Sequence, residues 1–89
     1  MKNNEFIKRY GKENLKSLIE GVKENLMVLH YNKEIPKYKI NTKKKQVEFC
    51  SNGKFISFDI AEIFYMNNTE IIKAIKVAER GIENATRQL

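Results

Sequence analysis

The stretch SFDIAEIFYMNNTEIIKAIKVAERG, residues 57–81, decides the fold that we expect for this chain. It reads as a short helix over 59–66, a turn that contains asparagine, and a longer amphipathic helix over 69–86. In the longer segment aliphatic side chains recur every three or four residues. One face of that helix therefore carries Ile71, Ala74, Ile75, Ala78 and Ile82. The pattern predicts a helix-turn-helix whose second helix buries this stripe.

The opposite face of the predicted second helix is polar and largely cationic. At about 100° per residue, the side chains within about 40° of the pole opposite the stripe are Thr69, Lys73, Lys76, Arg80, Asn84 and Arg87. The acidic side chains of the same segment fall on its flanks. A helix that buries an aliphatic side and points a line of cations outward suits contact with the phosphates and base edges of DNA.

Length and charge limit the classes of partner. At 89 residues we expect a single domain over 1–89, and 17 basic against 11 acidic residues give a net charge of +6. The excess is uneven, because residues 1–45 hold 12 basic and 5 acidic side chains, whereas residues 46–89 hold 5 and 6. Such a balance favours a polyanion or an acidic protein surface as partner.

Several functional classes find little support in the sequence. The single cysteine, Cys50, excludes an internal disulfide, and no spacing of Cys and His residues suits a metal. With one histidine and no Gly-rich phosphate loop, we expect no enzyme, no metal and no cofactor. No apolar window approaches the length of a membrane span, so we expect a cytoplasmic protein without membrane contact.

The rest of the chain predicts an α+β fold. Residues 12–31 carry an aliphatic stripe opposite Glu13, Glu20 and Glu24, and we expect this acidic-faced helix to brace the back of the DNA-facing surface. After Pro36, alternation predicts a strand near 37–41. Asn52-Gly53 then predicts a hairpin with a two-residue turn, because both residues tolerate positive φ angles.

That turn sets the register of the hairpin over 46–58. It places Phe49 opposite Ile56 and Val47 opposite Phe58, giving an apolar face to receive the helices. We therefore expect an N-terminal helix, an antiparallel hairpin or three-stranded meander, and a C-terminal helix-turn-helix in a winged-helix-like arrangement.

Two segments of the sequence resemble those of a known family. The hairpin and first helix NGKFISFDIAEIF, followed by NNTEIIKAIK, resemble phage-type helix-turn-helix regulators, particularly the Rha family, and TEIIKAIK is similar to the recognition helix of Cro-type repressors. The likeness covers about residues 46–80. Where those proteins usually have a glycine between the helices, this chain has Tyr65, followed by Asn67 and Asn68. The resemblance implies a DNA-binding regulator of phage or mobile-element origin.

We therefore predict contact with duplex DNA through two groups of residues. The first group lies in the helix-turn-helix and consists of Asn67, Asn68, Thr69, Lys73, Lys76 and Arg80. The second is the lysine turn Lys43, Lys44 and Lys45, with Lys37 and Lys39 extending the contact. The asparagines and threonine would fix the entry of the helix and the cations would contact phosphates or guanine.

Other interpretations stay open at this point. Residues 67–69 could act only as a helix cap, and the lysine turn could be solvated. The main alternative function is a small inhibitor or adaptor that binds a host protein, for example a host nucleic-acid enzyme, without binding DNA. A structural dimer module is a third. Met27, Val28 and Tyr31 extend the apolar character of the first helix and need cover, either from a two-fold partner in a homodimer or from the hairpin.

Overall fold

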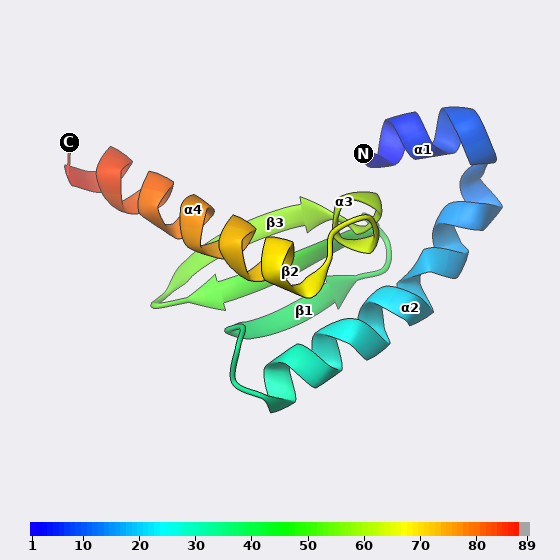
Figure 1. The fold of residues 1–89 in the computed structure, drawn as a ribbon. Helices are drawn as coiled ribbons and strands as arrows, with labels where there is room; N and C mark the ends of the chain where they lie inside the picture. Colours follow the sequence, from blue (N-terminus) through cyan, green and yellow to red (C-terminus); the bar gives the residue numbers. More distant parts are fainter. Residues whose placement is uncertain (88–89) are drawn as a thin grey trace.

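The computed structural model describes the backbone of residues 1–87 and the side chains of residues 1–81. The elements in chain order are α1 (Asn3–Tyr10), α2 (Lys12–Tyr31), β1 (Lys37–Asn41), β2 (Gln46–Ser51), β3 (Lys54–Asp59), α3 (Ile60–Phe64) and α4 (Asn68–Arg87) (Figure 1). The strands form an antiparallel sheet in the order β1-β2-β3. This arrangement confirms the predicted α+β class, with helices before and after a three-stranded meander. The side chains of Ile82, Asn84 and Arg87 lie outside the described residues.

The Asn52-Gly53 turn fixes the register of the hairpin as predicted. Both residues have positive φ angles, 52° and 78°, so they close a two-residue turn between β2 and β3. Phe49 pairs with Ile56 and Val47 pairs with Phe58. The inner face of the sheet therefore presents a continuous apolar surface.

Alanine substitutions at two glycines are expected to have opposite effects on stability. A Cβ at Gly53 or Gly81 would meet no atom within 4 Å, so only backbone conformation decides the outcome. We expect Gly53→Ala to lower the free energy of unfolding by about 1 kcal/mol, because Gly53 has a φ of +78°. We expect Gly81→Ala to raise it by up to about 1 kcal/mol, because Gly81 lies inside α4. Urea unfolding of the two variants measures both changes, and equal signs would contradict this account.

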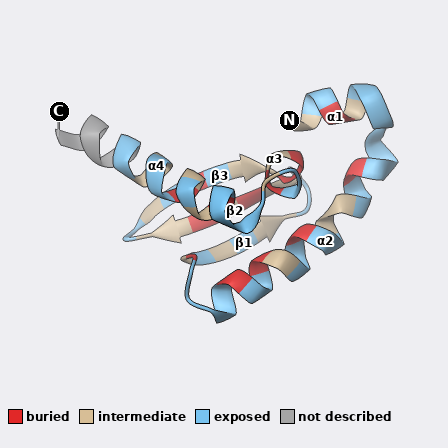
Figure 2. Ribbon diagram, viewed as in Figure 1, coloured by how far each residue is buried: buried red, intermediate tan, exposed pale blue. Residues whose placement is uncertain are grey.

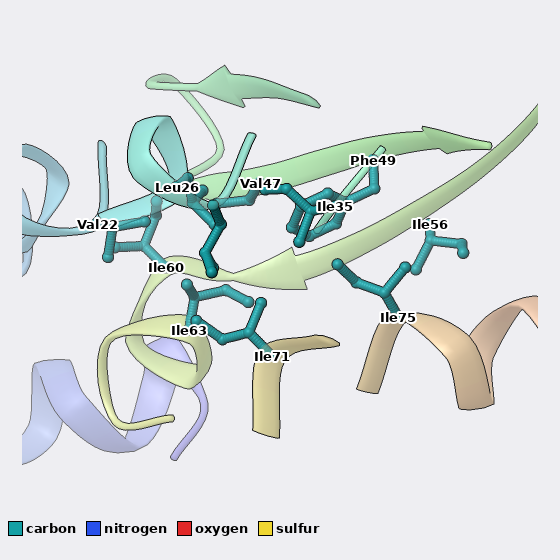
Figure 3. Close-up of a cluster of buried hydrophobic side chains, with 11 residues drawn as sticks. Val22, Leu26, Ile35, Val47, Phe49, Ile56, Ile60, Ile63, Ile71 and Ile75 are labelled. Carbon is teal, nitrogen blue, oxygen red and sulfur yellow. The ribbon is translucent and has the colours of Figure 1, made fainter. Parts of the chain in front are cut away.

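The main core lies between one face of the sheet and helices α2, α3 and α4. The sheet contributes Val47, Phe49 and Ile56, and α2 contributes its buried stripe of Val22, Leu26 and Leu29. Ile71 and Ile75 of α4 close the same cluster, as predicted (Figure 3). Buried residues recur at intervals along α2 and alternate with less buried ones along β2, as the colours in Figure 2 show.

Helix α1 is separate from α2. Gly11 breaks the two helices with a φ of +90°, and Phe6 of α1 packs against Leu15 and Ala61 in a second, smaller core. Asn3 holds the start of α1 in place. Its backbone N–H donates to Asp59 Oδ2 at 3.0 Å and its Nδ2 donates to the Lys45 carbonyl at 2.8 Å.

The same asparagine also contacts the first turn of α3, since its Oδ1 accepts from the Ala61 N–H at 3.1 Å. The Ile60 N–H donates to the Lys45 carbonyl at 3.0 Å. These bonds tie α1, the turn between β1 and β2, and the start of α3 to one point. Within the described chain, no helix combines the length and apolar character needed to cross a bilayer.

Candidate nucleic-acid interface

Helix α4 starts at a capping box that fixes its direction. The Asn67 side-chain oxygen accepts from the Glu70 N–H at 2.8 Å, and the Glu70 carboxylate accepts from the Asn67 N–H at 3.1 Å. Asn67 therefore uses its side-chain oxygen as a cap, while Asn68 and Thr69 are exposed on the first turn. Asp59 and Glu62 make a similar contact at the start of α3, where the Asp59 N–H donates to Glu62 at 3.2 Å.

The outer side of α4 carries the predicted cations. Ile71 and Ile75 are 0% and 2% exposed and anchor the helix on the core, which turns Lys73, Lys76 and Arg80 to the solvent. We call Thr69, Lys73, Lys76 and Arg80 the α4 cationic face. These four residues also line a shallow hollow of about 310 Å³, together with the apolar side chains of Ile72 and Val77. The face thus carries a line of positive charge around an apolar floor, which consists of Ile72 and Val77.

No acidic side chain among the described residues forms an ion pair with this face. The ion pairs in the described part of the chain join Lys2 to Glu62 at 3.0 Å and Lys16 to Glu13 at 3.8 Å. The first pair lies at the first turn of α3, and the hydrogen bond and charge of Glu62 raise the pKa of Lys2. On α4 itself, Glu70 is engaged in the capping box. Glu79 also lies on α4 and forms no ion pair with Lys73, Lys76 or Arg80, whose side chains are exposed to solvent.

The structure separates the two groups of predicted DNA-binding residues. Lys43, Lys44 and Lys45 lie in the turn between β1 and β2, beside the N-terminal ends of α1 and α3 (Figure 1). They line a hollow of about 390 Å³ that includes residues of α1 and α2 and none of α4. The Asn3 and Ile60 hydrogen bonds hold this turn beside the starts of α1 and α3, and its predicted contact with DNA phosphates stays a prediction.

Sequence reasoning missed Lys12 and Lys16 of α2, which line this same hollow. The sequence shows both residues on the flank of a helix whose outward side carries Glu13, Glu20 and Glu24, and those three glutamates are indeed exposed. What joins Lys12 and Lys16 to the lysine turn is packing between distant segments. No local pattern carries that information.

The remaining exposed groups lie elsewhere. Lys37 and Lys39 are on the outer face of the sheet, where they line a hollow of about 210 Å³ with Cys50 and the 73% exposed Phe55. Cys50 is half-buried on this outer face and pairs with Phe55 across the hairpin. Met27, Val28 and Tyr31 are 58%, 54% and 85% exposed, which shows that the hairpin does not cover them.

The chemistry of the described residues is concentrated at the surface. None of their polar or charged side chains is buried, and none of their His, Cys, Asp and Glu residues form a group that could hold a metal ion. On the α4 cationic face the polar groups available for binding are ammonium, guanidinium and hydroxyl donors. Such donors suit an anionic ligand.

Comparison of the chain with known protein families, with curated proteins and with solved structures found no match.

Proposed function

We propose that this chain is a small DNA-binding regulator that contacts duplex DNA through the α4 cationic face. The observation that carries the proposal is the line of three exposed cations without ion pairs to the described acids. From Lys73 to Arg80 the helix rises about 10 Å, at 1.5 Å per residue. The major groove is about 12 Å wide and admits an α-helix, so this line of charge can lie along it.

Within this proposal each predicted residue of the helix-turn-helix group has a role set by its position. Lys73, Lys76 and Arg80 contact phosphates, or guanine in the groove, and Asn68 and Thr69 approach the DNA from the first helical turn. Asn67 supports the contact indirectly, because its capping box orients α4. The apolar floor contributes Ile72 and Val77, side chains that can contact thymine methyl groups.

Helices α3 and α4, joined through residues 65–67, form the helix-turn-helix of this proposal, and the β2–β3 hairpin provides a winged-helix-like extension. The similarity to phage-type regulators supports the same function. The protein acts by binding alone, with no catalytic step, and a homodimer on paired half-sites is compatible with the exposed apolar end of α2.

The exposed apolar side chains at the C-terminal end of α2 support a second candidate function. Met27, Val28 and Tyr31 are exposed apolar side chains at adjacent positions on α2, and contiguous apolar patches of this kind mark protein-binding surfaces. In this alternative the chain is an inhibitor or adaptor that binds a host protein and does not bind DNA.

Fluorescence anisotropy with a labelled random duplex of about 20 base pairs tests the proposed function. We expect binding whose logarithm falls linearly with the logarithm of salt concentration, with a slope of about −2.7 or steeper for three or more phosphate contacts. Absence of binding at low salt would reject DNA recognition. A pull-down of one defined protein from host lysate, without duplex binding, would support the second candidate instead.

A further inference from the structure

We infer that the chain has a second anion site, a lysine hollow formed by Lys12, Lys16, Lys43, Lys44 and Lys45, that binds a phosphate group. The hollow has a volume of about 390 Å³ and shares no residue with the α4 cationic face. The site therefore goes beyond the proposed function and does not depend on it.

The fold brings together five lysines from two segments that are far apart in the sequence. Lys12 and Lys16 come from the first two turns of α2, and the other three come from the turn between β1 and β2. No carboxylate lines the hollow. The nearest ion pair joins Lys16 to Glu13 at 3.8 Å, with the glutamate side chain 88% exposed, so it neutralises little of this charge.

The lysine turn is fixed in place before any ligand binds. The Lys44 N–H donates to Asn41 Oδ1 at 2.9 Å, and the Lys45 carbonyl accepts from Ile60 and Asn3. The Lys45 ammonium group donates to the Thr42 carbonyl. A ligand therefore does not have to order this backbone, which lowers the entropic cost of binding.

Like charges held close together repel one another, and a multiply charged anion relieves that repulsion. Lysine contacts phosphate as a point charge through charge-assisted hydrogen bonds. The side-chain amide of Asn4, which is exposed at the same hollow, adds a neutral donor. The shared chemistry of the ligand is a phosphate group, carried either by a nucleic-acid backbone or by a free phosphorylated molecule.

The test compares three variants of the full chain, each lacking three positive charges. K12Q/K43Q/K44Q alters the lysine hollow, K73Q/K76Q/R80Q alters the α4 cationic face, and R9Q/K23Q/K33Q removes exposed charges from α1, α2 and the turn after α2. Circular dichroism melting confirms that each variant folds. Amide chemical shifts are then followed in titrations with pyrophosphate and with a 20-base-pair duplex.

We expect pyrophosphate to shift the amide signals of Asn3, Lys43 and Lys44 in the wild type. The hollow variant should bind pyrophosphate at least about tenfold more weakly, since one charge-assisted hydrogen bond is equivalent to about a tenfold change in dissociation constant. The α4 and control variants should bind it as the wild type does. An equal loss in the control variant, or no shifts at the hollow with either probe, would overturn the inference.

The duplex arm identifies the source of the phosphate. A smaller salt slope for the hollow variant, by about 0.9 per lost contact, identifies a nucleic-acid backbone. An unchanged slope beside weakened pyrophosphate binding identifies a free phosphorylated ligand. If the α4 variant binds duplex as the wild type does, the proposed function fails while the lysine hollow stands.

Discussion

The K73Q/K76Q/R80Q variant is expected to bind duplex DNA about a hundredfold more weakly than the wild type, if three contacts of about 1 kcal/mol each are lost. The salt slope should become smaller by about 2.7, or 0.9 for each phosphate contact removed. Glutamine keeps good helix propensity, so α4 should still form. Anisotropy titrations from low to moderate salt give both quantities.

The matched control is R9Q/K23Q/K33Q. It also removes two lysine charges and one arginine charge, but from other exposed positions. It lowers the net charge equally, so it measures the general attraction between the protein and DNA. If both variants lose the same affinity and slope, α4 is not the contact surface. A loss specific to the α4 variant supports a docked helix.

Truncation of Phe49 is expected to produce the largest loss of stability. Phe49 is 0% exposed at the centre of the main core, with its ring centroid 6.0 Å from that of Phe58 and 6.5 Å from that of Tyr38. We expect Phe49→Ala to lower the free energy of unfolding by about 3–5 kcal/mol, because it removes apolar contacts and leaves a cavity. For a domain of marginal stability this is a large fraction of the total. Chemical denaturation measures the change.

Phe55→Ala is the control for that experiment. Phe55 lies on the neighbouring strand of the same hairpin but points to the outer face, where it is 73% exposed. We expect its truncation to change the free energy of unfolding by less than about 0.5 kcal/mol, as is usual for a surface position. Comparable losses at Phe49 and Phe55 would show that the sheet buries both faces.

Elements encoded by local patterns could be predicted from the sequence. Asn52-Gly53 permits a turn with positive φ, and that turn fixes every pair of the hairpin. The aliphatic stripe predicts a helix over 12–31, which is α2 with the same bounds. Asn67 followed by Glu70 is also a readable signal, because this spacing predicts the capping box that the structure contains.

The rest depends on contacts between distant segments. Asn3 contacts Lys45, Asp59 and Ala61, and no periodicity in the sequence pairs these positions. The lysine hollow follows from that contact, because Asn3 helps to hold the lysine turn against the helices.

Cys50 follows a local rule. Alternation from Val47 and Phe49 places Cys50 on the outer side of the sheet with Phe55, where it is half-buried although cysteine in general tends to be buried.

The lysines of β1 have one more consequence. In the sheet order β1-β2-β3, strand β1 has a neighbour on one side only, and its exposed residues Lys37 and Lys39 alternate along it. An unpaired margin of this kind can recruit the same strand of another molecule, and regularly spaced ammonium groups oppose that recruitment by mutual repulsion. Fibril growth through this strand is thereby disfavoured, even in concentrated solutions.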